Sequence, residues 1–165
     1  RFAVRHDGPI AIRYPRGNVY EGLSEYQEPI ILGKSEVIYK ESDIAILSVG
    51  HMMEVAKQVQ NILKDNGYAC SLVNARFVKP FDTDMLDDLA KDHKLFVTIE
   101  EATISGGYGE HVAKYVLDKQ LDVNVQVHGV PDIYVEHGSI TKLRETIQLD
   151  AKSITDKVML ARKEM

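Results

Sequence analysis

Apolar residues along the chain show two spacings, which alternate from one segment to the next. Continuous apolar runs at 44–49, 69–73, 95–99 and 123–127 have the length of buried strands. Between them lie segments whose apolar residues recur three and four positions apart, as on one face of a helix, at 52–63, 85–90 and 112–117. Strands that alternate with helices form right-handed crossovers in a mostly parallel sheet covered on both faces. The pattern therefore predicts an α/β fold.

Polar residues at the ends of these segments predict where the helices begin and end. Asp82, Ser139 and Asp150 each precede a helical pattern and have side chains suited to an N-cap. Gly67 follows the first helical segment and is expected to close it. The apolar runs 36–39 and 44–49 flank a short polar gap, which favours a hairpin and an antiparallel edge strand.

The first 34 residues have a different pattern. Ile10, Ile12 and Tyr14 alternate with other residues as in a strand, and Pro15 would end that strand. Residues 17–29 have no period and the composition of an exposed connector, so a domain boundary is placed within them. Because the chain opens on Arg1 with a strand-like segment soon after, we expect a piece of a longer polypeptide.

Composition narrows the class of protein. The chain has 165 residues, of which 44% are hydrophobic and 27% charged, values typical of a soluble globular domain. A formal net charge of -5 makes nucleic acid and anionic membranes poor partners. Cys70 is the single cysteine, so no internal disulfide can form and a reducing compartment is expected. Its position in an apolar run predicts a core residue.

Two arginines are the strongest candidates for binding chemistry. Arg13 and Arg16 follow the first strand-like segment, and ligands of α/β sheets gather at the carboxyl ends of strands. The planar guanidinium matches the oxygens of a phosphate or a carboxylate. Pairing of both arginines with surface carboxylates is an equally open alternative.

A glycine-rich loop at 106–109 is a second candidate. Its amides would bind an anion at the start of a helix, but a tight strand-to-helix turn is the favoured interpretation. Glu100 and Glu101, just before it, point to opposite faces of an extended chain, so they are interpreted as polar residues at a sheet end. The histidines show no metal-ligand spacing, and no zinc constellation is expected: His51, His93, His111, His128 and His137.

Four segments, in order, carry a resemblance to a known family. They are Gly8-Pro-Ile-Ala-Ile-Arg-Tyr-Pro-Arg-Gly17, Asn74-Ala-Arg-Phe-Val-Lys-Pro-Phe-Asp82, Glu100-Glu101 with Gly106-Gly-Tyr-Gly109, and Gly129-Val-Pro-Asp132 with His137-Gly138. Together they resemble the 1-deoxy-D-xylulose-5-phosphate synthases, thiamine-diphosphate enzymes of the transketolase group. The third segment is shared with other transketolase-like proteins, whereas the first two favour the synthases.

The resemblance implies a fold and a division into domains. The expected fold is the transketolase C-terminal domain, a mixed, mainly parallel five-stranded sheet with helices on both faces. Residues 1–17 would be the last strand of the pyrimidine-binding middle domain, residues 18–34 a linker, and residues 35–165 the C-terminal domain.

The resemblance also implies an activity for the whole enzyme. Such a synthase condenses pyruvate with D-glyceraldehyde 3-phosphate to give 1-deoxy-D-xylulose 5-phosphate and CO2, a precursor of isoprenoids, thiamine and pyridoxal. Thiamine diphosphate and Mg2+ would bind mainly outside this chain, because the Gly-Asp-Gly motif of the family is absent from it. Arg16 would bind the acceptor phosphate, with Arg13 as a weaker candidate.

Further expectations concern the context of the chain. We expect no catalytic, cofactor-binding or metal-binding residue in this segment, no activity of the isolated segment, and a cytoplasmic homodimeric enzyme. Two alternatives stay open at this point: another transketolase-like enzyme, such as a 2-oxo acid dehydrogenase β subunit, and a non-catalytic module for anion binding or oligomerisation.

Overall fold

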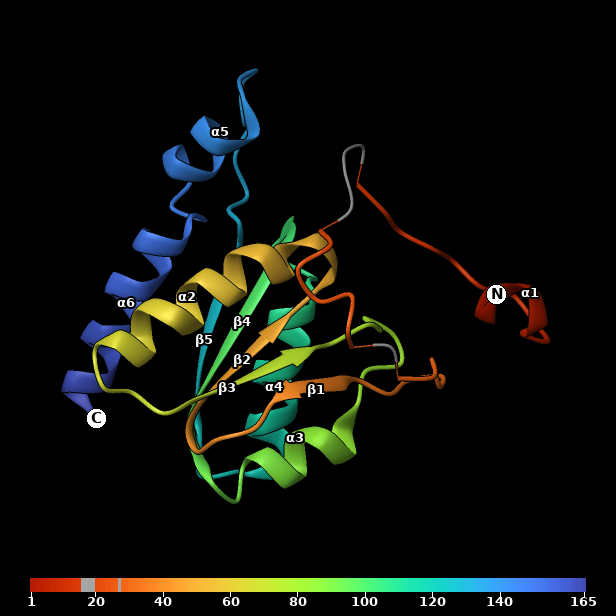
Figure 1. Cartoon of the computed structure of the whole chain (residues 1–165), viewed down its shortest axis with the longest axis horizontal. Helices are drawn as coiled ribbons and strands as arrows, with labels where there is room; N and C mark the ends of the chain where they lie inside the picture. The colour runs from red at the N-terminus through yellow and green to blue at the C-terminus, as the bar shows by residue number, and fades with distance from the viewer. Residues whose placement is uncertain (16–19, 27) are drawn as a thin grey trace.

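The computed structural model describes residues 1–15, 20–26 and 28–165. A five-stranded sheet with strand order β1-β3-β2-β4-β5 lies at its centre (Figure 1). Strands β2 to β5 run parallel to one another, and β1 runs antiparallel to β3. The predicted mixed, mainly parallel sheet is therefore confirmed. The strands are β1 (Glu36–Tyr39), β2 (Asp43–Ser48), β3 (Cys70–Asn74), β4 (His93–Thr103) and β5 (Asn124–Val130).

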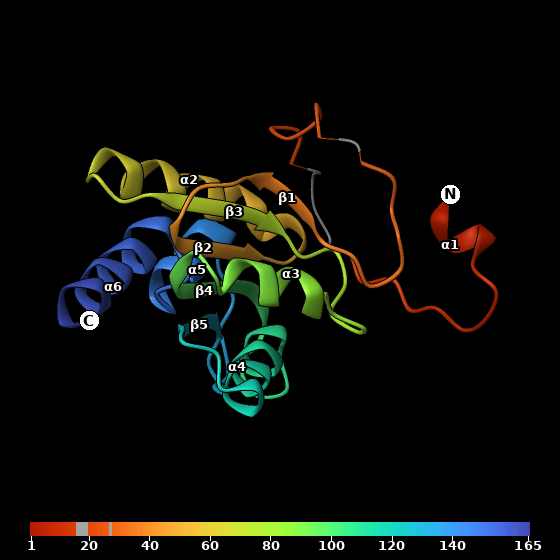
Figure 2. The same ribbon diagram turned by 90° about the horizontal axis from the view of Figure 1, so that it is seen from below.

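Helices cover both faces of the sheet (Figure 2). α2 (Met53–Asp65) and α6 (Ala151–Glu164) pack on one face, and α3 (Thr83–Leu89) and α4 (Tyr108–Lys119) on the other. Each face of the sheet has its own hydrophobic core, and alternate residues of β2 belong to the two cores. Ile44 and Ile46 pack under α2 and α6, and Ala45 and Leu47 pack under α3 and α4. The remaining helical segments are α1 (Phe2–Arg5), the 3-10 turn η1 (Gly50–Met52) and α5 (Ile140–Thr146).

The predicted helix ends are confirmed. The side chains of Asp82, Ser139 and Asp150 accept hydrogen bonds from backbone amides at the starts of α3, α5 and α6. Gly67, which follows the C-cap residue Asn66 of α2, has φ +83°, a left-handed conformation that glycine adopts without steric cost.

The predicted hairpin is wrong, although β1 is an antiparallel edge strand. β1 pairs with β3, which lies between β1 and β2. In the polar gap, the Glu41 carboxylate accepts the Cys70 amide at 2.9 Å and the Glu41 amide donates to Ser71 Oγ at 2.8 Å. The gap thus crosses the start of β3 instead of turning back tightly. β2 is buried along its length and takes a parallel neighbour on each side, which leaves the edge for the half-exposed β1.

The N-terminal segment also differs from the expectation of a strand. Residues 9–15, all described, contain neither helix nor strand, and Ile12 and Tyr14 are exposed. A strand needs a neighbour for its backbone hydrogen bonds, and these residues run outside the sheet (Figure 1). Their assignment to the last strand of a preceding domain stays a prediction.

Candidate functional site

The sheet order creates a crevice at the carboxyl ends of β2 and β4. β2 continues through α2 to β3 on one side, whereas β4 continues through α4 to β5 on the other side. Ligands of open α/β sheets bind where the connections diverge in this way. A cleft of about 550 Å³ lies here, and its lining residues include His51, from η1 just after β2, and Glu101, near the end of β4.

Glu101 connects the walls of this cleft. Its carboxylate lies 2.6 Å from His51 Nε2, measured to Oε2. Arg144 of α5 donates to the other oxygen, Oε1, from Nε at 3.3 Å and from Nη2 at 3.2 Å. A third partner, Arg13, donates from Nη2 to the main-chain carbonyl of Glu101 at 2.5 Å. One residue therefore joins four segments that are far apart in the sequence.

An irregularity in β4 places Glu101 for these contacts. The ladder between β4 and β5 is interrupted between Ile99 and Thr103, where residues 100–102 face the single residue Gly129. A Cβ atom at Gly129 would lie 2.9 Å from the carbonyl oxygen of Ala102, so glycine allows the close approach. Bulges of this kind redirect side chains and free backbone groups at functional sites.

Glu100 points to the opposite side from Glu101, as the sequence predicts. It is 2% exposed, and its carboxylate accepts the amides of Tyr108 at 3.0 Å and Gly109 at 2.8 Å. Glu110 accepts the amide of Gly106. These amides of the glycine loop are therefore occupied by carboxylates of the chain itself. The loop is a tight turn, and the alternative of an anion cradle is not supported.

Removing the Glu100 carboxylate should destabilise the start of α4. Glu100→Ala leaves two buried amides unpaired, so we expect the free energy of unfolding to fall by about 1–2 kcal/mol. Urea unfolding followed by circular dichroism would measure it. Glu110→Ala, at an exposed carboxylate in the first turn of α4, is the control, and equal losses in the two variants would contradict the capping role of Glu100.

Of the two arginines predicted as binding residues, the structure describes only one. Arg13 is exposed and donates to the Glu101 carbonyl, and Pro15 lines the cleft. Arg16 lies outside the described residues. The contact of Arg13 that the structure shows is with a main-chain carbonyl, so surface pairing with a carboxylate does not describe it.

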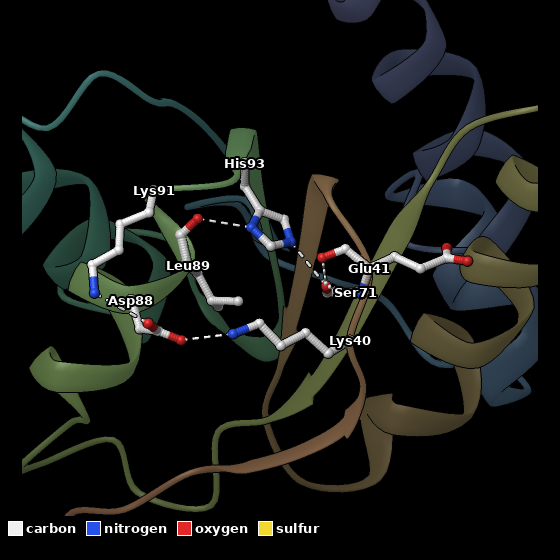
Figure 3. Close-up of polar contacts among 7 residues, drawn as sticks. All are labelled: Lys40, Glu41, Ser71, Asp88, Leu89, Lys91 and His93. Atoms are coloured by element: carbon white, nitrogen blue, oxygen red, sulfur yellow. Dashed lines mark hydrogen bonds and ion pairs between the residues drawn. The ribbon is translucent and has the colours of Figure 1, made fainter.

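Other candidates from the sequence have structural roles. Cys70 is buried in the core as predicted, and burial raises the pKa of its thiol to about 12. His93 is buried at the start of β4, with Nδ1 2.7 Å from the Leu89 carbonyl and Nε2 2.8 Å from Ser71 Oγ (Figure 3). Burial lowers the pKa of His93, so the neutral ring joins α3, β3 and β4.

The family-like segment 74–82 attaches the connector to the sheet. Arg76 Nη2 lies 2.5 Å from Glu36 Oε2, and Arg76 Nη1 donates to the Pro29 carbonyl at 3.4 Å. Asp82 Oδ2 accepts the Ser35 amide at 2.8 Å. The charged residues of this segment therefore hold residues 28–36 in place.

Sequence reasoning missed His51 and Arg144 as partners of Glu101. His51 directly follows an apolar strand run, a position at which ligand-binding residues occur, and this was the available signal. Arg144 carried no such signal, because its side chain reaches Glu101 only through the tertiary placement of α5.

The described residues do not fit thiamine diphosphate or its metal. Residues 1–15, 20–26 and 28–165 contain no group of three or more His, Cys, Asp or Glu side chains arranged to hold a metal ion. The helix amides that would receive a diphosphate are bound to Glu100. In the described part of the chain, every helix is too short or too polar to span a bilayer.

Known proteins resemble the chain in sequence and in fold. Residues 33–154 match the family described as "Transketolase, C-terminal domain". The 1-deoxy-D-xylulose-5-phosphate synthase of Lachnoclostridium phytofermentans is 42% identical over 163 residues, which cover 95% of this chain and 25% of that protein. The same-named enzyme of Synechococcus is 40% identical over 153 residues, 92% of this chain and 24% of that protein.

A solved structure agrees with the sequence matches. The protein described as "Split gene transketolase, inactive beta4 tetramer" superposes with a TM-score of 0.74 at 26% identity, over 80% of this chain and 43% of that chain. The chain spans about a quarter of the length of the curated relatives described above.

Proposed function

Because the chain belongs to the transketolase C-terminal domain family, we propose that it is the C-terminal part of a 1-deoxy-D-xylulose-5-phosphate synthase. The whole enzyme would condense pyruvate with D-glyceraldehyde 3-phosphate to 1-deoxy-D-xylulose 5-phosphate and CO2. The observation that supports this most is 42% identity across 95% of the chain to a synthase of which the chain covers a quarter. The relatives described above are synthases and transketolases, so a 2-oxo acid dehydrogenase β subunit is not favoured.

The cofactor would lie outside the described residues. Thiamine diphosphate with Mg2+ supplies the electron sink for the decarboxylation of pyruvate. The described residues contain no group of three or more metal-ligating side chains, and the amides at the start of α4 are bound to Glu100, so the proposed contribution of this segment is structural and acceptor-related.

Production of 1-deoxy-D-xylulose 5-phosphate tests this function directly. The full-length protein that carries this sequence would be supplied with pyruvate, D-glyceraldehyde 3-phosphate, thiamine diphosphate and Mg2+, and the product detected by mass spectrometry. We expect turnover by the full-length protein and none by residues 1–165 alone. A full-length protein that decarboxylates pyruvate but transfers the two-carbon unit to lipoamide instead would contradict the proposal.

Arg16 is proposed to bind the acceptor phosphate in that enzyme. Arg16→Ala would remove a charge-assisted hydrogen bond of roughly 1.5–3 kcal/mol, so kcat/KM for D-glyceraldehyde 3-phosphate should fall about tenfold or more. Steady-state kinetics would measure this, with D-glyceraldehyde as an acceptor without phosphate. An equal loss with both acceptors would exclude phosphate binding by Arg16.

We also propose that the full-length enzyme is a cytoplasmic homodimer. The related split-gene transketolase chain is described as a tetramer of its own kind, which supports self-association within this family. Sedimentation of the full-length enzyme would test the state of assembly.

A further inference from the structure

Residues 131–146 form an arm in which no residue is buried. The arm leaves the end of β5, contains α5 and returns to the chain that leads into α6. Figure 1 shows α5 beyond the ends of the strands, outside the helices that cover the sheet. A helix of seven residues is not stable by itself in water, so the order of α5 depends on its contacts with the rest of the domain.

The hydrophobic core holds the chain on both sides of the arm. Val130, the last residue of β5, packs against the core between the sheet and the pair α2 and α6. Ile147 packs against the same core, and Leu149 is buried in it. Between them, Gln148 has φ +57°, a conformation that residues other than glycine rarely adopt, so the chain turns sharply there. The arm is therefore attached at two fixed points, and its displacement leaves the core intact.

A single side chain of the arm makes polar contacts with the body of the domain. Among the described residues, the hydrogen bonds and ion pairs that join the arm to the chain outside 131–150 are those of Arg144 with Glu101 Oε1, at 3.3 Å from Nε and 3.2 Å from Nη2. The ion pair of Lys142 with Glu145 stays within α5. Arg144 is 14% exposed, so water screens its contact with Glu101 less than it screens pairs on the open surface.

The arm also supplies one wall of the cleft at the carboxyl ends of β2 and β4. Its residues Ile140, Thr141, Arg144 and Glu145 line the cleft together with residues of η1, α2 and the start of α6. On the body of the domain, His51 contacts the second carboxylate oxygen of Glu101. Glu101 therefore keeps a partner on the body when Arg144 leaves it.

The charges that line the cleft make Arg144 decisive for the position of the arm. The body contributes the carboxylates of Glu54, Glu101 and Asp150, and its basic lining residue is His51. The arm contributes Arg144 and Glu145. Without Arg144, the arm would bring only a carboxylate towards a cleft that is already acidic, and like charges repel one another at short range.

We propose that the arm is a hinged wall of the cleft, which the contact of Arg144 with Glu101 holds closed. Separation of this one side-chain contact lets residues 131–146 move away from α2 and widens the cleft, while the core on both sides of the arm stays packed. The inference concerns this domain alone, so its tests do not require the activity proposed for the whole enzyme.

Hydrogen–deuterium exchange of residues 1–165, followed by mass spectrometry, tests the proposal. Arg144→Ala should raise the exchange rate of the α5 amides roughly fivefold or more, whereas the amides of α6 and β4 should exchange as in the wild type. Alanine has the highest helix propensity, so a weaker intrinsic helix would not explain the rise. Lys142→Ala removes a cation that pairs within α5 and is the matched control, with an expected change below about twofold.

A salt titration of the wild type distinguishes an ion-pair latch from apolar packing of α5. Between about 0.05 and 1 M NaCl, exchange of the α5 amides should rise roughly twofold or more relative to that of the α6 amides, because salt screens the contact of Arg144 with Glu101. Arg144→Ala should show no such rise. A wild type whose α5 exchange does not respond to salt would contradict the latch even if no variant could be purified.

A double-mutant cycle assigns the effect to this pair of residues. Glu101→Gln removes the charge of the acceptor but keeps the main-chain carbonyl that binds Arg13, and it should raise α5 exchange in the same direction as Arg144→Ala. The double variant should then show less than the product of the two single effects. Unchanged α5 exchange in Arg144→Ala, an equal rise in α5, α6 and β4, or full multiplicativity in the double variant would each overturn the proposal.

Discussion

Arg76→Ala is expected to lower the free energy of unfolding by about 3–5 kcal/mol. The Arg76 guanidinium lies 2.5 Å from the Glu36 carboxylate, and the two side chains are only 14% and 4% exposed. Truncation of the arginine leaves the buried carboxylate without its cation, and the Glu28 amide at 3.1 Å remains as a hydrogen-bond donor. Most of the desolvation cost of that charge is then no longer offset. Arg76 also contacts the Pro29 carbonyl, so the connector should become more mobile at the same time. Urea unfolding of the chain would measure the loss.

Two comparison variants identify the cause of this loss. Lys40→Ala removes an ion pair of similar length to Asp88, but those side chains are 50% and 53% exposed, so about 0–1 kcal/mol is expected. The double variant Arg76→Met with Glu36→Leu removes both charges together and should recover most of the stability. A loss below about 1 kcal/mol in Arg76→Ala would show that solvent screens the Arg76–Glu36 pair.

Acidification should destabilise the folded chain through His128. This side chain is 5% exposed, its Nε2 has no hydrogen-bond partner among the described residues, and burial, followed by the charge of Lys157, lowers its pKa to about 4. The unfolded chain binds a proton on His128 as the pH falls through about 6.5, whereas the folded chain does so only near pH 4. The part of the free energy of unfolding that comes from the neutral, buried His128 is therefore complete above pH 6.5. It is lost as the pH falls from 6.5 towards 4. The free energy of unfolding falls by about 3 kcal/mol over this range.

His128→Leu should remove this part of the pH dependence. At pH 7.5 the variant is expected to be about as stable as the wild type, because an unpaired buried nitrogen is replaced by an apolar group. At pH 4.5 the variant should be the more stable protein by about 2.5 kcal/mol. Burial lowers the pKa of His93 as well, so some acid sensitivity should remain. His137→Asn, at an exposed histidine, controls for the loss of one imidazole, and identical acid profiles of His128→Leu and wild type would contradict this account.

Local patterns in the sequence predicted most elements correctly. Helix spacing, N-cap residues and the glycine after α2 are properties of neighbouring residues, so the bounds of α2, α3, α4 and α6 follow closely from short segments. The hairpin was wrong because two adjacent strand runs do not reveal a third strand between them. That insertion depends on contacts of Glu41 with Cys70 and Ser71, which are about thirty positions further along the chain.

In the candidate site, too, local sequence predicted some features and tertiary contacts decided the others. The sequence placed Glu100 and Glu101 on opposite faces, because side chains alternate along any extended segment. It did not reveal that Glu100 caps α4 or that Glu101 joins His51, Arg144 and Arg13, since these partners meet only after the sheet has formed. Likewise, the sequence of segment 74–82 indicated the family. Its role in holding the connector became visible only in the structure, where Arg76 lies beside Glu36.

The sequence by itself determined the fold class, the two apolar faces of the sheet and the membership of a family, because periodicity and motifs are carried by residues close together in the chain. The tertiary structure decided the strand order, the bulge at residues 100–102 and the contact of Arg13 with the Glu101 carbonyl, because each depends on which distant segments the folded sheet brings into contact.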